Sequence, residues 1–425
     1  MPAVATAPAA LPGLPWPRGL AYAGLAVPLA FVSLPLYVNL PYHYATAFGM
    51  PLAALGGVVL AVRALDAVID PALGRLADGL FNRGRAWAAA ALGALLMALA
   101  FAALWWPPQG GPAVVLPWLA GALLLCTLAY SGVSILHQSW GTRWGGGPEL
   151  RARVAGWREA GTLAGVLFAS ALPALAGWGV TSAVLAGLLL LGLLGLRRVP
   201  APQPAAEDGA ATATPWRQPA FRRLAVVFML NGIATAIPAT LLPFFIADRL
   251  QAPDLQPVLL LAYFGAAVLG LPLWVKAGAR WGLAPAWRAG MAAAVAAFAV
   301  TPLLGAGDTW AFGIVCAASG LMLGADLALP GALLTGVIQA AGDGQRGEGR
   351  YLGWWACMTK LNLALAAGLA LPLLALAGYT PGQRDSTGLQ ALTWAYGGLP
   401  CLLKIAAAGW LWRAERRHID WKERE

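Results

Sequence analysis

Three charged residues interrupt an apolar stretch near the start of the chain. Residues 63–79 read RALDAVIDPALGRLADG, with Arg63, Asp66 and Asp70 in a run otherwise apolar enough for a membrane helix. At 3.6 residues per turn, the spacings of three and four residues place these side chains on one helix face. Two carboxylates this close in a low dielectric repel, so they need a cation, a proton or basic partners. The pattern predicts a coupling-ion site, in which Asp66 and Asp70 bind Na⁺ or H⁺ and Arg63 balances charge.

A second interpretation of the same residues is a structural ion pair that joins helices. Asp70-Pro71 would then mark a kink near a helix end. An ionisable group at the bilayer centre costs about 2.5–3.5 kcal/mol, so either interpretation turns these side chains toward the protein interior. A purely structural pair leaves unexplained why this helix carries two acids for one arginine.

The composition decides which solvent the helix meets. The chain has 425 residues, of which 60% are hydrophobic and 11% are charged. Soluble proteins have about 25% charged residues, so this chain is an integral membrane protein. Its net charge of +10 indicates membrane topology and no nucleic-acid partner. The four cysteines fall inside apolar runs without disulfide or metal spacing, and the N-terminus lacks the pattern of a cleaved signal peptide.

Hydrophobic runs divide the chain into twelve expected membrane helices, each long enough to cross about 30 Å of hydrocarbon. The expected spans are 19–41, 51–74, 86–106, 113–137, 154–177, 179–197, 223–247, 255–277, 287–306, 310–338, 352–379 and 388–412. We therefore predict an all-α membrane protein.

The stretch at 200–219, PAPQPAAEDGAATATPWRQP, is rich in Pro and Ala without an apolar period and is typical of a linker. The predicted organisation is a six-helix half at 1–199, a cytoplasmic linker at 200–219, a second six-helix half at 220–412 and a tail at 413–425.

Of the 28 Lys and Arg residues, only Arg249 and Arg384 fall in loops on the side opposite the linker. The positive-inside rule thus predicts cytoplasmic termini in a cytoplasmic (inner) membrane.

Other charges lie within the expected spans. Lys360 could extend to the cytoplasmic surface or reach Asp66 and Asp70 from the second half as a further positive partner. Lys404 lies nearer a span end, where extension to the surface is the favoured interpretation. Asp326 could contact a substrate or pair with a basic residue, and Arg158 could face a central cavity or the cytoplasm.

Several segments together resemble one known family. RALDAVIDPALG is similar to the second-span signature of the glycoside–pentoside–hexuronide:cation symporters, a branch of the major facilitator superfamily. GRLADGLFNRGR resembles the loop motif of the superfamily, with Gly74, Asp78, Arg83 and Arg85 as gating residues. Residues 130–161 and 342–381 resemble the family's fourth and fifth spans and its eleventh span, so the resemblance covers nearly the whole chain.

The resemblance implies a role for individual residues. Asp66 and Asp70 take the positions of the cation-binding carboxylates, Ser131 that of a hydroxyl that helps to hold Na⁺, and Lys360 that of the membrane lysine. Arg158 falls on an arginine near the substrate cavity. The implied fold has two six-helix halves that alternately open to the two sides of the membrane.

The departures from the family concern the substrate. The sugar-binding acids are absent, because Ala30 and Ser134 stand at their positions, and Gln138 replaces an aromatic residue. Ile69 replaces an amide before the second cation-binding acid. We therefore expect a small organic solute other than a melibiose-like sugar, with Ser134, Gln138, Arg158, Asp326 and Trp354 as candidate substrate contacts. An alternative role for Trp354 is to pack against neighbouring helices.

These residues are compatible with more than one function. The favoured class is a Na⁺- or H⁺-coupled symporter without a cofactor, acting as a monomer in the lipid bilayer on a small-molecule substrate. Alternatives are a proton-driven exporter and a cation-coupled transporter of a lysolipid-like amphipathic molecule. An enzyme is disfavoured, since no nucleophile elbow, HExxH motif or phosphate-binding loop occurs in the sequence.

Overall fold

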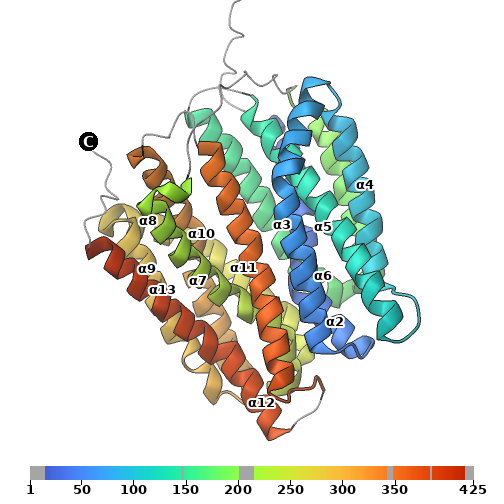
Figure 1. Cartoon of the computed structure of the whole chain (residues 1–425), viewed down its shortest axis with the longest axis vertical. Helices are drawn as coiled ribbons and strands as arrows, with labels where there is room; N and C mark the ends of the chain where they lie inside the picture. Colours follow the sequence, from blue (N-terminus) through green and yellow to red (C-terminus); the bar gives the residue numbers. More distant parts are fainter. Residues whose placement is uncertain (1–14, 145–147, 201–214, 342–347, 383–384, 417–425) are drawn as a thin grey trace, which may run out of the picture.

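The computed structural model describes residues 15–144, 148–200, 215–341, 348–382 and 385–416. All regular elements within these ranges are helical, and they form two bundles that lie side by side (Figure 1). The first bundle contains α1 (Trp16–Leu34), η1 (Pro35–Asn39), α2 (Leu40–Ala47), α3 (Leu52–Asn82), α4 (Ala86–Trp105), α5 (Pro112–Thr142) and α6 (Pro148–Leu196).

The second bundle follows after residue 214. It contains η2 (Pro215–Arg217), α7 (Pro219–Phe244), η3 (Phe245–Arg249), η4 (Pro253–Leu255), α8 (Gln256–Trp281), α9 (Leu283–Phe298), η5 (Thr301–Leu303), α10 (Thr309–Ala340), α11 (Glu348–Leu376), α12 (Ser386–Thr393), η6 (Trp394–Gly398) and α13 (Leu399–Arg416). The elements η1, η3 and η6 are single π-helical turns inside longer helices.

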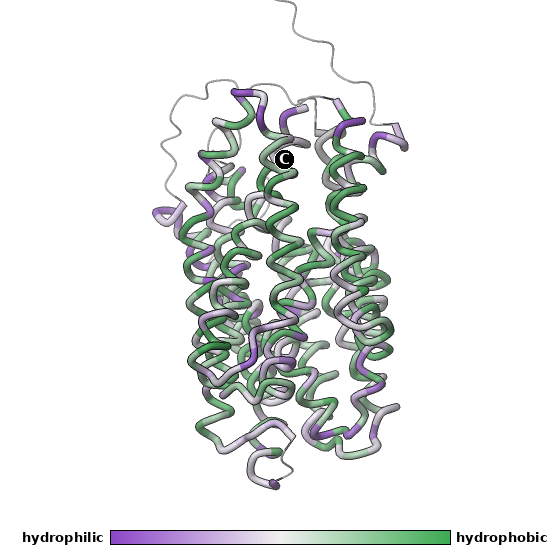
Figure 2. Tube along the Cα trace, turned by 90° about the vertical axis from the view of Figure 1, so that its right-hand side faces the viewer, coloured by the Kyte–Doolittle hydropathy of each residue, from purple (hydrophilic) through white to green (hydrophobic). Residues whose placement is uncertain are grey.

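Most of the surface along the helices is apolar. Eleven helical segments of the described residues are long and apolar enough to cross a membrane. Hydrophobic residues dominate their length, and hydrophilic residues gather toward the ends (Figure 2). Large side chains such as Leu175, Trp310 and Leu376 are at least 77% exposed, as expected for groups that meet lipid.

The difference between twelve predicted and eleven observed segments has its cause inside α6. This element spans 49 residues, but Gly177 adopts φ 74° and ψ 174° and breaks the helix. The left-handed φ is accessible to glycine because it lacks a Cβ. The break coincides with the predicted boundary between the fifth and sixth spans.

The packing of α1 shows that the chain reverses at Gly177. In the first part of α6, Gly161 packs on Ala23 and Gly165 on Val27, so this part runs parallel to α1. In the second part, Gly192 packs on Leu25 and Gly195 on Ala21, so this part runs antiparallel to α1. The two parts of α6 therefore cross the membrane separately, and the prediction of twelve helices is confirmed.

The two bundles meet along an antiparallel seam between α3 and α11, which lie next to each other in Figure 1. Gly56 packs against Pro372, and Gly368 packs against Leu60. Small residues at these positions let the helix backbones approach closely, which is how membrane helices gain packing energy. Helices α6 and α8 form a second contact between the bundles.

The bundles are closed against each other at the end where α2 finishes and α3 begins. The rings of Tyr42 in α2 and Phe244 in α7 make an edge contact across the bundles, with centroids 5.1 Å apart. At the same end, within the second bundle, Tyr379 donates a hydrogen bond to Asp248, and the Gly382 backbone N–H donates to the same carboxylate at 3.0 Å. We call this end the closed face. The opposite end, where α1 begins and α13 ends, is the terminal face.

Candidate functional site

Asp66 and Asp70 lie one turn apart on α3 and both face Lys360 of α11. The Lys360 Nζ atom lies 3.1 Å from Asp66 Oδ2 and 2.5 Å from Asp70 Oδ2. It donates hydrogen bonds to Asp70 Oδ1 at 2.6 Å and to Ser131 Oγ of α5 at 2.7 Å. A single ammonium group from the second bundle thus contacts three residues of the first.

Ser131 connects this ammonium to the more buried acid. Its hydroxyl donates a hydrogen bond of 2.8 Å to Asp66 Oδ1. The side chains of Asp66, Asp70 and Lys360 are 4%, 16% and 18% exposed, respectively. Charged groups buried to this extent are stable only when they are paired with groups of opposite charge. We call Asp66, Asp70, Ser131 and Lys360 the α3 cluster; with both acids ionised it carries one net negative charge.

Arg63 shares the face of α3 but makes a different contact. Its guanidinium lies over the ring of Tyr37 in η1, with Cζ 3.7 Å from the ring centroid. The residue is 3% exposed, and its Nε and Nη2 atoms have no hydrogen-bond partner among the described residues. Within the described ranges it forms no ion pair with Asp66 or Asp70. The aromatic ring stacks on the flat face of the guanidinium, but this contact provides no acceptor for the N–H groups at the guanidinium edge.

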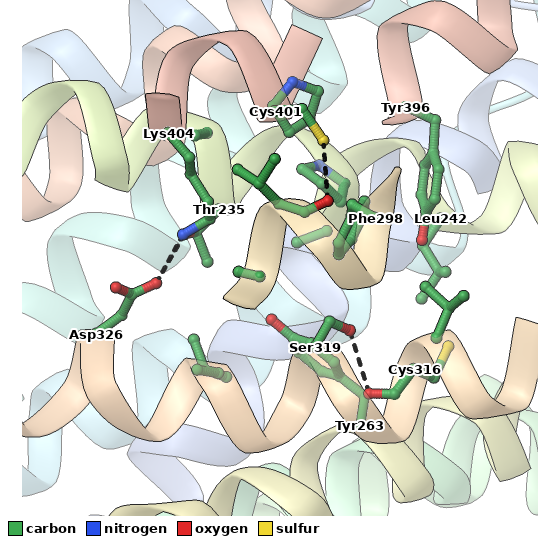
Figure 3. A pocket seen from close by; sticks show the side chains of 18 of the residues that line it. Thr235, Leu242, Tyr263, Phe298, Cys316, Ser319, Asp326, Tyr396, Cys401 and Lys404 are labelled. Carbon is green, nitrogen blue, oxygen red and sulfur yellow. Dashed lines mark hydrogen bonds and ion pairs between the residues drawn. The ribbon is translucent and has the colours of Figure 1, made fainter. Parts of the chain in front are cut away.

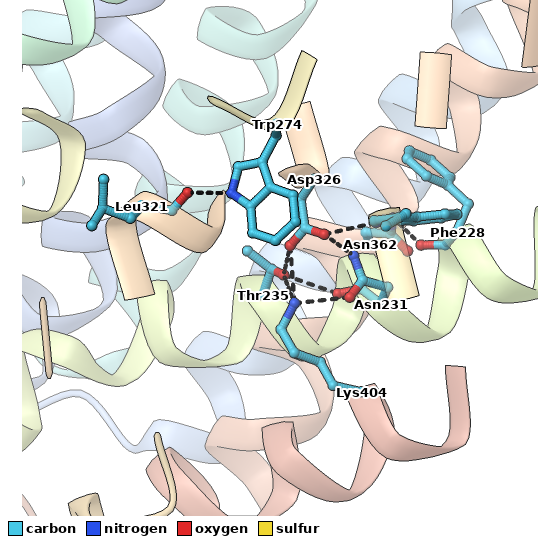
Figure 4. A network of polar contacts seen from close by, with 9 residues as sticks. Phe228, Asn231, Thr235, Trp274, Leu321, Asp326, Asn362 and Lys404 are labelled. Carbon is cyan, nitrogen blue, oxygen red and sulfur yellow. Dashed lines mark hydrogen bonds and ion pairs between the residues drawn. The ribbon is translucent and has the colours of Figure 1, made fainter. Parts of the chain in front are cut away.

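A second group of polar residues joins α7, α9, α10 and α13 through hydrogen bonds. Figure 4 shows its members Asn231, Thr235, Asp326 and Lys404. Asp326 Oδ1 accepts from Asn231 Nδ2 at 2.8 Å and Trp287 Nε1 at 2.9 Å. Asp326 Oδ2 accepts from Lys404 Nζ at 2.9 Å and Thr235 Oγ1 at 3.2 Å. These five residues are the α10 cluster. Because a carboxylate has about four acceptor positions, Asp326 is saturated.

Lys404 is buried in this cluster. It is 8% exposed and donates to Asn231 Oδ1 at 2.8 Å, to Thr235 Oγ1 at 3.1 Å and to Asp326. The interpretation that Lys404 extends to the membrane surface is therefore wrong. The reason is that Asn231, Thr235 and Asp326 together offer an acceptor for each of its three donor hydrogens.

The two clusters differ in what they can still bind. The α10 cluster is neutral, and its ammonium and carboxylate are satisfied internally. In the α3 cluster, by contrast, both oxygens of Asp70 contact only the Lys360 ammonium among the described residues. The α3 cluster therefore retains acceptor capacity and a net negative charge, which are the properties a cation requires.

Sequence reasoning missed Asn231, Thr235 and Trp287. Asn231 and Thr235 stand four residues apart in the apolar stretch FMLNGIATAIP, so they share a face of α7. Two hydrogen-bonding side chains on one face of a membrane helix are a signal that could have identified them. Trp287 has no such signal, because it lies near the start of an expected span, where tryptophan is common as an interface anchor.

A pocket in the second bundle adjoins the α10 cluster (Figure 3). It lies between α7, α8, α9, α10 and the η6–α13 segment, and Val38 of η1 also lines it. Leu242, Phe298 and Tyr396 are typical of its wall, which is mainly aliphatic and aromatic. Asp326 and Lys404 lie at one end. The pocket thus offers an apolar volume with one polar end.

The remaining predicted substrate contacts lie apart from this pocket. Gln138 is exposed and donates to half-buried Ser134 at 3.2 Å on the same helix. Arg158 pairs with the adjacent Glu159 at 2.9 Å. Exposed Trp354 makes an edge contact with Trp216 of η2, with centroids 5.2 Å apart.

The predicted gating residues lie mostly on a helix. Helix α3 continues to Asn82, so Gly74 and Asp78 are helical and not part of a loop as expected. Apolar residues at 73, 76, 77, 80 and 81 continue the helical period beyond the predicted end of the span. The turn consists of residues 83–85, in which Arg83 and Arg85 are exposed. The side chain of Asp78 lies outside the described residues, as do most of the predicted linker and tail.

The donors of the α3 cluster suit an alkali cation. No group of three or more His, Cys, Asp and Glu side chains able to hold a metal ion occurs in the described part of the chain. Carboxylate and hydroxyl oxygens are hard ligands, which favour cations such as Na⁺ over transition metals.

The chain matches the profile of the MFS/sugar transport protein family over residues 20–415. The protein belongs to the major facilitator superfamily. The resemblance seen in the sequence to its glycoside–pentoside–hexuronide:cation branch is consistent with this match. No match is found among curated proteins.

Solved structures of major facilitator superfamily transporters share the fold. A bacterial homologue of the human lysosomal transporter Spinster, in an inward-facing and unoccupied conformation, has a TM-score of 0.68 and 15% identity, with 97% of this chain and 99% of that chain covered. The nucleoside transporter NupG has a TM-score of 0.67 and 15% identity, with 92% and 98% covered. At this identity the likeness shows the fold, and with the family match it identifies the chain as a transporter.

Proposed function

We propose that this transporter couples the movement of a small organic solute to that of a cation, Na⁺ or H⁺, in symport. The observation that carries the proposal is the α3 cluster. It places two carboxylates and a hydroxyl in the seam between the halves, with a net negative charge and spare acceptor capacity. A purely structural ion pair requires only one acid for Lys360.

The position of the cluster explains how binding could drive transport. Transporters of this fold alternate by rocking one half against the other around a site near the bilayer midplane. Asp66 and Asp70 belong to one half and Lys360 to the other, so the charge state of the cluster changes the energy of their contact. A solute and a cation that both favour the same arrangement are thermodynamically coupled.

The proposal is tested by the melting temperature of the purified protein in NaCl, LiCl and KCl at matched ionic strength and at several pH values. We expect Na⁺ or Li⁺ to stabilise the protein selectively, by about 2.7 kcal/mol at a concentration 100 times the Kd. Asp70→Asn should abolish this response, because the neutral amide removes a charged ligand.

Asp254→Asn is the matched control, since Asp254 is exposed in η4 and distant in sequence from the cluster. It should melt with the ion dependence of the original protein. Melting that depends on pH through Asp70, without alkali selectivity, would favour protons and keep the proton-driven exporter as the alternative. Insensitivity to both ions and Asp70→Asn would refute the coupling site in favour of a structural ion pair.

The pocket of the second bundle supports an amphipathic substrate as a second candidate. Its apolar wall and polar end match a molecule with an apolar tail. For the protein in lipid nanodiscs, in a buffer that contains Na⁺, lysophosphatidylcholine should raise the melting temperature of the protein, whereas melibiose should not. Ala239→Trp, which narrows the pocket, should remove the effect, and Ala299→Trp, at an exposed position outside the lining, should retain it. Stabilisation by melibiose alone would contradict this candidate.

A further inference from the structure

Lys360 occupies a particular place in the seam between α3 and α11. Starting at the closed face, Gly56 meets Pro372, Leu60 meets Gly368, and Asp66 and Asp70 meet Lys360. The Lys360 contact therefore continues a regular antiparallel pairing. Lys360 thus lies farther from the closed face than the two glycine contacts of the seam.

The ammonium lies where a bound cation would lie. Its Nζ atom is within 2.5–3.1 Å of oxygens from Asp66, Asp70 and Ser131. These are the oxygens that would coordinate Na⁺, and hard cations bind such ligands at comparable distances. Na⁺ and the ammonium would compete for this position, because both would use the same oxygens and two cations repel at close range.

Arg63 allows the exchange of one cation for the other without a change in buried charge. In the ion-free protein, the one net negative charge of the α3 cluster is compensated by Arg63, which is buried one turn away on α3 and forms no ion pair with the described residues. If Na⁺ enters and Lys360 leaves, the two acids are balanced by Na⁺ and Arg63. Both states are neutral, so neither incurs the large cost of an uncompensated buried charge.

We propose that the Lys360 ammonium is a tethered occupant of the cation site, which holds the two halves together in the ion-free transporter and is displaced when Na⁺ binds. This inference rests on the proposed function of the α3 cluster. It assigns Lys360 a role that charge balance alone would not require, because a balancing lysine would remain in place when the ion binds. Na⁺ binding would then release one of the contacts that join the halves.

The test measures the reactivity of individual lysines toward N-hydroxysuccinimidyl acetate by peptide mass spectrometry. The purified protein is treated in NaCl or KCl at matched ionic strength. An amine held between carboxylates reacts slowly, so we expect acetylation of Lys360 to rise about tenfold in saturating Na⁺ as its free fraction increases. Lys404 is the internal control, because its ammonium is buried and satisfied in the α10 cluster. Its reactivity should not change.

Lys360→Met gives a second measurement. Without the Lys360 ammonium as a competitor, the Na⁺ concentration that gives half of the melting shift should fall about tenfold. This factor is expected if about one tenth of the sites are free of Lys360 in the original protein, because the apparent Kd is the intrinsic Kd divided by that fraction. In Asp70→Asn, Lys360 should react rapidly without Na⁺, because it has lost its closest partner.

The outcomes separate this inference from the proposed function. If Na⁺ raises the melting temperature while Lys360 remains unreactive, the ion and the lysine bind at the same time. That result would refute the displacement of Lys360 but would leave the proposed coupling site intact. An unchanged half-saturating concentration in Lys360→Met would refute displacement in the same way. If Na⁺ changes neither melting nor Lys360 reactivity, and Asp70→Asn melts like the original protein, the proposed function fails with it.

Discussion

Asp326→Ala is expected to lower the apparent melting temperature by roughly 3–6 °C, the largest effect of any single substitution in the polar interior. Asp326 is the only anion in the α10 cluster and accepts hydrogen bonds from four residues. Its removal leaves Lys404, which is 8% exposed, as an unpaired buried cation. Breaking a buried pair from one side typically costs about 3–5 kcal/mol. Thermal unfolding followed by intrinsic tryptophan fluorescence measures the change.

The matched control removes both charges. Asp326→Leu combined with Lys404→Met should recover most of the lost stability, because no uncompensated charge remains. A double variant as unstable as Asp326→Ala would show that the hydrogen bonds of Asn231 and Trp287, and not the charge pair, dominate. If Asp326→Ala melted at the same temperature as the original protein, Asp326 would not be needed for stability. The substrate contact expected from the sequence would then be the favoured role.

Gly165→Val is expected to disrupt the packing of the first bundle. A Cβ atom at Gly165 would lie 2.1 Å from the carbonyl oxygen of Val27 and 3.0 Å from the Ala30 side chain. The nearest atom belongs to a helix backbone and cannot rotate away, so α1 and α6 must separate. Overpacking of this kind costs about 1–3 kcal/mol or more, because close helix approach is the source of packing energy in lipid. Gel-filtration profiles and melting temperatures in mild detergent measure the outcome.

Gly156→Val on the same helix is the control for the intrinsic effect of valine. A Cβ at Gly156 meets nothing within 4 Å, so this variant should express and melt like the original protein. Comparable damage from both substitutions would indicate that helix propensity, and not the contact with α1, determines the loss. Damage confined to Gly165→Val would support the close packing of the first part of α6 against α1.

The architecture was predictable because hydropathy acts on whole segments. Each span must bury its backbone polar groups in its own hydrogen bonds while showing apolar side chains to lipid, and both requirements are visible in the sequence. Even the division of α6 was visible, since the predicted boundary at 177–179 contains Gly177, whose φ is positive. The end of α3 was less predictable, because a helix can continue past the hydrocarbon into the polar region.

The partners of individual charges were harder to predict. Helical periodicity placed Arg63 on the face of Asp66, but the long side chain reaches Tyr37 of a neighbouring helix. Hydropathy placed Lys404 near a span end without indicating which way its side chain points. The choice between surface and interior depended on Asn231 and Asp326, 173 and 78 residues away. Such contacts depend on the register between helices, which a single sequence does not reveal.

The antiparallel seam between α3 and α11 would act as a lever if the two halves rock against each other. Pro372, at the closed face, lies twelve residues from Lys360, or about 18 Å along α11 at 1.5 Å per residue. If the halves pivot at Gly56 and Pro372, a rotation of about 10° displaces the Lys360 ammonium by about 3 Å. That displacement is enough to break every bond the ammonium makes, while the glycine contacts near the pivot barely move. The distance along one helix would thus amplify a small tilt into a complete loss of contact at the proposed cation site.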